Sequence, residues 1–182
     1  MGRVQASAPR LPCHLDTGPD SQLSGKADLM AINPNTDFSA GSVLTADQMN
    51  RLPRGIVAIA SSTTSDASIT VEEIELTSSS FTAVANRYYR ATYYEPQLNT
   101  ASGAGSYLVT KIRLTNVTGT ILNQAIFQVG GANITGITLW VGTLSAGSTT
   151  IVATAIAGSG TWVATRSATQ VGLLVVEDIG PA

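Results

Sequence analysis

One cysteine and one histidine are the residues of this 182-residue chain with the most general catalytic chemistry, and they are neighbours, Cys13 and His14. A nucleophilic site needs an imidazole that a third group holds beside the nucleophile. Both residues lie in a segment without hydrophobic periodicity, so we predict no rigid element to orient them. Two ligands also fall short of the three or four that a zinc site requires. The sequence therefore predicts no catalytic residue, no cofactor and no enzyme.

The densest acidic cluster is Glu72, Glu73 and Glu75. Glu73 and Glu75 would share one face of a strand, where residues two apart lie about 6–7 Å from each other. Retaining glycosidases instead hold two carboxylates about 5 Å apart on facing elements. A calcium ligand set is an alternative, because hard cations take several oxygen ligands. The favoured interpretation is a solvated strand face, so we predict no metal site.

Four tyrosines form the one cluster that could stack on a sugar ring or on a protein partner. In a strand, Tyr89 and Tyr93 would lie on one face, and Tyr88 and Tyr94 on the other. We expect one pair to pack inside the protein and the other pair to lie at an interface. All four are therefore candidate surface-binding aromatics until the strand is placed.

Short apolar or alternating segments separated by glycine-rich turns fill the chain from residue 55 onward, a pattern typical of β-strands. The run 55–60 predicts a buried strand, and Trp140 and Trp162 fall at core positions. In 68–76 the alternation changes face at 72–73, which predicts a bulge or a break between two strands. With no helix between the strands, we predict an all-β, antiparallel, jelly-roll-like sandwich of eight or nine strands.

Residues 45–53 give the one clear helix signal. Thr45 and Gln48 fit a capping box, Leu44 and Met49 could form the hydrophobic staple, and Pro53 ends the helix. We predict a short connecting helix here, after an extended arm over 1–44 and before a sandwich domain over 54–182. The arm is either a disordered tail or a strap that orders against a partner. The residues predicted to anchor the chain are Leu44, Thr45, Gln48, Met49, Leu52 and Pro53.

Charged residues make up only 12% of the chain, and the net charge is −2. Average soluble domains carry about twice that charged fraction, so we expect much of the surface to be covered by neighbouring subunits. No basic stripe or apolar run of membrane-spanning length is present. These features predict neither nucleic acid nor membrane as a partner.

Three segments resemble a known group of proteins. Residues 37–55 contain the pattern G-x-x-L-T-A-x-x-M-N-x-L-P-x-G, residues 87–90 read RYYR, and residues 177–181 read EDIGP. They resemble small accessory virion proteins of tailed bacteriophages, described as minor tail proteins, head or tail fibres, or capsid decoration proteins. The resemblance implies a structural protein with capsid or tail proteins as partners and with no catalytic residues to carry over.

The resemblance and the low charge together imply a homo-oligomer, a trimer, that assembles into the virion in the host cytoplasm. The arm and helix would attach it while the sandwich projects outward. The alternative is a carbohydrate- or receptor-binding module, or an adhesin tip, that binds a host-surface glycan through the tyrosine cluster. The sequence leaves open head or tail location, strand order, oligomer size, any receptor and the order of residues 1–36.

Overall fold

A computed structural model describes residues 43, 45–100, 106–128 and 133–182. The predictions made for residues 1–42 and for Leu44 lie outside these residues. The described residues form one α-helix and twelve strands: α1 (Ala46–Asn50), β1 (Gly55–Ser62), β2 (Asp66–Ile69), β3 (Glu73–Thr77), β4 (Phe81–Ala83), β5 (Arg87–Thr100), β6 (Tyr107–Leu114), β7 (Ile121–Gln128), β8 (Ile134–Thr143), β9 (Gly147–Thr149), β10 (Ile151–Ala157), β11 (Trp162–Ala164) and β12 (Gly172–Pro181).

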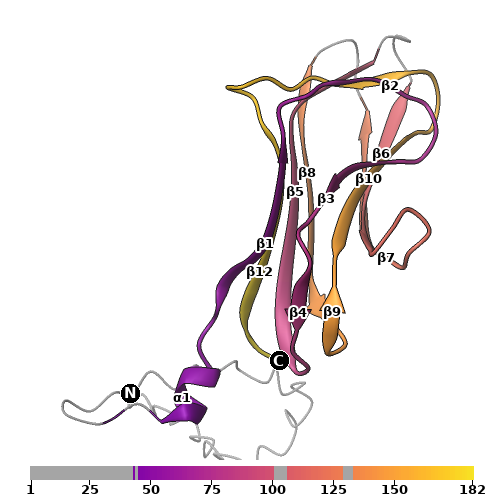
Figure 1. Ribbon diagram of the computed structural model, residues 1–182. Coiled ribbons are helices and arrows are strands. Elements are labelled where there is room, and N and C mark those ends of the chain that lie inside the picture. The colour runs from indigo at the N-terminus through magenta and orange to yellow at the C-terminus, as the bar shows by residue number, and fades with distance from the viewer. Residues whose placement is uncertain (1–42, 44, 101–105, 129–132) are drawn as a thin grey trace, which may run out of the picture. The chain divides into compact units, whose positions relative to one another are not determined.

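Two antiparallel sheets carry the fold (Figure 1). The six-stranded sheet has the order β1-β12-β5-β11-β2, with β8 pairing along the other edge of β5, and the four-stranded sheet has the order β3-β10-β6-β7. Eight longer strands thus alternate between two layers in the jelly-roll order β1-β12-β5-β8 and β3-β10-β6-β7. This confirms the predicted antiparallel sandwich. The remaining strands are short: β2 and β11 extend one sheet, and β4 and β9 pair with each other.

The core lies between the two sheets and follows the two-residue period of a strand. In β5 the odd-numbered positions from 87 to 95 are buried, and Tyr89 and Tyr93 pack with Ile112 and Ile151 of the facing sheet. A second cluster at one end contains Trp162 with no exposed surface. The predicted core positions 140 and 162 both pack in these two clusters, 140 only partly buried.

The predicted buried strand at 55–60 is wrong in its burial. β1 is an edge strand, and Ile56 and Ile59 expose 61% and 51% of their surface while Ala58 faces the core. Only one face of β1 packs against the other sheet, so an apolar residue on its opposite face stays exposed. The change of face at 72–73 is a true break, because β2 and β3 belong to different sheets.

The predicted capping box at α1 is confirmed. The backbone N–H of Thr45 donates to Gln48 Oε1 at 2.9 Å, and the N–H of Gln48 donates to Thr45 Oγ1 at 3.3 Å. The helix ends at Asn50, shortly before Pro53. Within the described part of the chain, no helix is long and apolar enough to cross a membrane.

Candidate functional site

A buried arginine ties α1 to the sandwich. Arg87, at the start of β5, donates through Nε and Nη2 to the two oxygens of Asp178 at 2.5 and 2.7 Å. Its guanidinium also donates to the carbonyl oxygens of Asn50 and, at 2.7 Å, Leu52. The last carbonyls of a helix have no partner within it, and a cation near them is favourable. Arg87 therefore caps the C-terminal end of α1 and neutralises a buried carboxylate of β12.

This contact joins the three segments that carry the phage-protein resemblance. The helix motif supplies the carbonyls of Asn50 and Leu52, RYYR supplies Arg87, and EDIGP supplies Asp178. The other arginine of RYYR, Arg90, pairs with Glu177 at 2.8 Å. Segments about 40 and 90 residues apart in sequence thus meet at one junction between the helix and two adjacent strands.

Of the six residues predicted from the sequence to anchor the chain, the five that the structure describes lie in α1 or next to this junction. Thr45 and Gln48 use their side chains to cap the helix, and Met49 exposes 53% of its surface. Leu52 is half-buried and Pro53 is exposed. None of these five residues is fully buried.

The outer surface of the six-stranded sheet carries a row-by-row array of apolar side chains across β1, β12, β5 and β8. In one register row Ile59, Val175, Thr92 and Leu139 lie side by side. The neighbouring rows are Ser61, Leu173, Tyr94 and Ile137 on one side, and Ile56, Glu177, Arg90 and Val141 on the other. We call this surface the outer apolar face; its apolar residues are Ile56, Ile59, Tyr94, Ile137, Leu139, Val141, Leu173 and Val175.

The outward side of β8 is apolar, which is unusual for a sandwich strand. Ile137, Leu139 and Val141 point outward with about half of their surface exposed, while Trp140 packs on the core. An antiparallel sheet with one face in water normally alternates apolar and polar residues. A contiguous exposed apolar patch on a soluble domain marks an interaction surface.

The four tyrosines divide between these environments. Tyr89 and Tyr93 are buried, and their hydroxyls donate or accept inside the protein: Tyr89 Oη accepts from the N–H of Val84 at 2.8 Å, and Tyr93 donates to Glu95 at 3.0 Å. Tyr88 and Tyr94 are half-buried on the opposite side of β5. Only this second pair faces the side of the outer apolar face.

The outer surface of the four-stranded sheet carries an ion cluster beside exposed apolar side chains, which include Ile74, Ile121 and Ile126. At the centre of the cluster, Glu72 accepts hydrogen bonds from Lys111 at 2.7 Å, Arg113 at 2.7 and 3.0 Å, and Thr154 at 2.8 Å. Burial raises the pKa of Glu72, but these hydrogen bonds outweigh it and lower the pKa to about 2.

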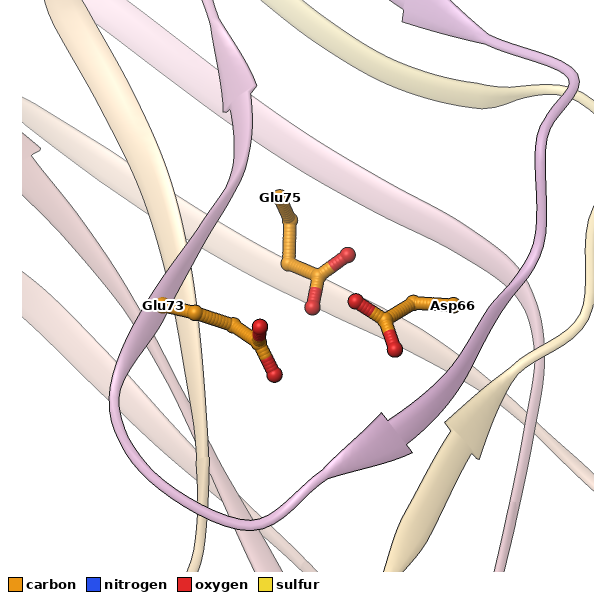
Figure 2. A group of neighbouring side chains, drawn as sticks. All are labelled: Asp66, Glu73 and Glu75. Carbon is orange, nitrogen blue, oxygen red and sulfur yellow. The ribbon is translucent and has the colours of Figure 1, made fainter.

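A cluster of carboxylates lies between β2 and β3. Figure 2 shows the side chains of Asp66, Glu73 and Glu75 pointing toward one another. One oxygen of each lies within 4.8 Å of the others. The predicted solvated strand face is wrong for Glu75, whose side chain exposes only 1% of its surface. The physical reason is that Arg166, which also binds Glu95 of β5, and Asp66 of β2 lie against the Glu75 carboxylate, and the local sequence does not reveal these distant neighbours.

One arginine, Arg166, forms ion pairs with two carboxylates in and beside this cluster. Arg166 donates to Glu75 Oε2 at 2.6 Å and to both oxygens of Glu95. Burial, together with the charges of Asp66 and Glu95, raises the pKa of Glu75 to about 7 although Arg166 opposes this. Burial and the charge of Asp66 also raise the pKa of Glu73.

Sequence reasoning missed two features of these sites. The outer apolar face had a local signal, because residues 137–141 read ITLWV without a polar position on either face except Thr138. The contact of Arg166 with Glu75 and Glu95 had no local signal in the sequence. Arg166 lies 91 residues from Glu75 and 71 residues from Glu95. Only the fold brings these groups together.

Comparisons with known proteins add little to the site. No family model matches this chain, and no curated protein matches it. A solved structure that it resembles is a carbohydrate-binding module, CBM6cm-2 from Cellvibrio mixtus lichenase 5A in complex with cellotriose. The two are 13% identical, with a TM-score of 0.34 over 68% of this chain and 98% of that chain. A likeness at this level supports no statement about a ligand or activity of this chain.

Proposed function

We propose that this chain is a structural accessory protein of a tailed-phage virion, attached through its N-terminal arm and α1 and presenting a β-sandwich. The observation that carries the proposal is the Arg87 junction. It gives one structural role to the three segments that resemble phage virion proteins, since it holds α1 against the ends of β5 and β12. A fixed attachment helix is what a subunit anchored at one end requires.

The outer apolar face supports contact with further copies of this chain. Its one charged pair among the described strands, Arg90 and Glu177, is neutral overall, so two copies bring no net charge together. Four strands about 4.8 Å apart and eight residues long, as in β1, give a surface of about 500 Å² in plan. That is over half of the about 800 Å² per partner buried in a standard interface. We therefore assign this face to a second copy of the chain.

The location in the virion is tested by cryo-electron microscopy of particles of the phage that encodes the chain. The expected result is density for the sandwich on the capsid, tail or baseplate, with α1 on the particle side. Symmetric copies on the shell would identify a decoration or head-fibre protein, and density at the tail a minor tail or fibre protein. Absence of the chain from purified particles would overturn the proposal.

The contact between copies is tested by the mass of the full-length protein in solution. The double variant Ile59→Lys/Leu139→Lys places two charges at the ends of one register row of the outer apolar face. It should dissociate the oligomer without changing the circular dichroism spectrum. The matched control is Ile126→Lys, since Ile126 is even more exposed than Ile59 and Leu139 but lies on β7 of the other sheet.

Light scattering measures the mass of the wild-type protein and of both variants, and the wild-type mass also gives the number of copies in the oligomer. A dimer fits two copies packed through the same face, and a trimer, as the resemblance implies, fits contact of this face with a different surface of its neighbour. A monomeric wild-type protein at high concentration, or an oligomer that survives the double variant, would refute the assignment of this face.

The alternative function is binding of a host-surface glycan or receptor by the tyrosine pair that faces outward. Tyr94 lies in a register row between Leu173 and Ile137, where its ring is accessible from one side. Tyr94→Ala should then abolish glycan binding by the folded protein, measured on a glycan array. Tyr88→Ala is the companion variant on the same side of β5. Unchanged binding in both would remove this alternative.

A further inference from the structure

The carboxylates of Asp66, Glu73 and Glu75 converge from two different sheets. Asp66 begins β2 of the six-stranded sheet, and Glu73 and Glu75 lie on β3 of the four-stranded sheet. Their side chains point into one shared space in Figure 2, with one oxygen of each within 4.8 Å of the others. Three oxygens that bind one ion at about 2.3–2.6 Å can lie at most about 5 Å apart. The spacing therefore fits a single cation among them.

Two of these carboxylates have an oxygen that the protein leaves unsatisfied. Oε1 of Glu75 and Oε1 of Glu73 are buried and have no hydrogen-bond partner among the described residues. The Glu75 side chain is 99% buried, since only 1% of its surface is exposed, and its other oxygen is occupied by Arg166 at 2.6 Å. An unpaired buried polar atom costs about 1–3 kcal/mol, and more when it is charged. Such an atom calls for a ligand.

The charge of the region points to a cation. Four carboxylates interact here, those of Asp66, Glu73, Glu75 and Glu95. Arg166 is the cation that contacts Glu75 and Glu95. When all are ionised, four negative charges and one positive charge leave −3. The nearby Lys111 and Arg113 are engaged by Glu72 on the outer surface of the four-stranded sheet.

We propose that Asp66, Glu73 and Glu75 bind a divalent cation, and that the cation is Ca²⁺. Calcium accepts irregular sets of carboxylate oxygens at about 2.3–2.6 Å, whereas Mg²⁺ requires near-octahedral ligands at about 2.0–2.1 Å and retains several waters. Oxygens as far apart as 4.8 Å are compatible with the larger ion. The bound ion gives the unpaired oxygens of Glu73 and Glu75 a partner, and its charge offsets two of the three excess negative charges.

The site would fasten the two sheets to each other at one end of the sandwich. Asp66 pairs with Ala164 of β11, and β3 pairs with β10, so the ion links the ends of both layers. Calcium binding would then stabilise the folded protein, because an ion that binds only the native state raises the free energy of unfolding. This role is independent of the virion proposal and holds for a free protein as well.

The test uses the full-length protein freed of metal with EDTA and then desalted. Isothermal titration with CaCl2 should show one site per chain, and MgCl2 should bind more weakly. At about one hundred times Kd, calcium should raise Tm by about 5–10 °C. Tb³⁺ serves as an optical probe, because Trp162 lies on β11, the partner strand of β2, and can sensitise its luminescence.

The variants separate binding from folding. Glu73→Gln and Asp66→Asn each remove one ligand charge while keeping the side-chain shape, and Asn at 66 still accepts the hydrogen bond from the N–H of Ser68. Both should lose the calcium-dependent rise in Tm and the Tb³⁺ signal. Glu177→Gln makes the same charge change on the outer apolar face and should keep both.

Three outcomes would overturn the proposal. The first is no heat and no change in Tm on adding CaCl2 to the wild-type protein, which would leave a proton shared between the carboxyls as the neutralising group. The second is an equal rise in Tm for wild type, Glu73→Gln and Asp66→Asn. The third is binding of MgCl2 at least as tight as that of CaCl2, which would refute the assignment of the ion.

Discussion

Glu72 and Glu75 lie three residues apart in sequence and have opposite electrostatic environments. Glu72 sits under Lys111, Arg113 and Thr154, and their hydrogen bonds lower its pKa to about 2 against the effect of burial. Burial and neighbouring carboxylates raise the pKa of Glu75 to about 7. The difference arises because the chain changes face between them, so one carboxyl turns to the outer surface and the other to the closed end of the sandwich.

At the residue scale, we expect Glu72→Gln to lower the free energy of unfolding at pH 7 by about 1–3 kcal/mol. Hydrogen bonds between charged groups contribute about that much, and the partly exposed site limits the upper end. Urea unfolding followed by circular dichroism measures the change. The control is Glu177→Gln, because Glu177 forms its single ion pair with the more exposed Arg90 and should cost less than about 1 kcal/mol.

The pH dependence of this difference follows from the lowered pKa of Glu72. An acid with a lowered pKa in the folded state binds its proton more weakly there, so its stabilisation is full above the unfolded value of 4.5. It is lost as the pH falls from about 4.5 to about 2. Wild type and Glu72→Gln should therefore converge in stability below pH 3. A constant difference between pH 7 and pH 3 would contradict this account.

At the element scale, β5 is the strand that contacts each of the sites described above. Its first half pairs with β12 and β8, its last residues pair with β11, and its two faces belong to the core and to the outer apolar face. The arginine at its start holds α1, and Glu95 further along binds Arg166. A single strand thus positions α1, the outer apolar face and one wall of the acidic region.

The two arginines of β5 make a matched test of the junction. Arg87 and Arg90 each pair with an acid of β12, but Arg87 and Asp178 are almost completely buried whereas Arg90 is about half exposed. Arg87→Met should cost about 3–5 kcal/mol, because it leaves the buried Asp178 carboxylate with Arg54, 4.0 Å away, as its remaining cationic neighbour. Arg90→Met should cost less than about 1 kcal/mol.

Urea unfolding measures both costs, and limited proteolysis reports on the helix. With Arg87→Met, the carbonyls of Asn50 and Leu52 lose their donor, so cleavage within 45–54 should speed up under native conditions. Equal stabilities of the two variants, or unchanged cleavage with Arg87→Met, would show that α1 is held by other contacts.

At the scale of the whole molecule, both sheets of the sandwich carry exposed apolar side chains on their outer surfaces. The six-stranded sheet has the outer apolar face, and the four-stranded sheet has Ile74, Ile121 and Ile126 beside the ion pairs of Glu72. Under the proposal made above, neighbouring copies cover part of this surface, and the low overall charge of the chain agrees with that proposal.

Removal of residues 1–36 tests whether the arm is needed for attachment to the particle and not for folding of the sandwich. The truncated protein should keep the Tm of the full-length protein, because the two core clusters lie entirely within residues 58–176. It should no longer join particles when it replaces the wild-type chain in an infection. A deletion variant that is incorporated normally would show that attachment does not require the arm.

The sequence by itself determined the class of fold and its local signals. Two-residue alternation, glycine-rich turns and the absence of helical periods predicted the antiparallel sandwich, and the Thr45–Gln48 capping box placed the helix. These features depend on neighbours along the chain, so they can be read locally. The face change at 72–73 was visible for the same reason.

Only the tertiary structure decided what surrounds each side chain. The pattern of 55–60 has apolar residues on both faces and that of 137–141 has them on both faces apart from Thr138, but which face is left uncovered depends on the strand order β1-β12-β5-β8. The meeting of Arg87 with Asp178, and of Glu75 with Asp66 and Arg166, depends on pairing between strands distant in sequence. Burial and charge are set by such neighbours in space, and for that reason the side chain of Glu75 looked solvated in the sequence and is enclosed in the fold.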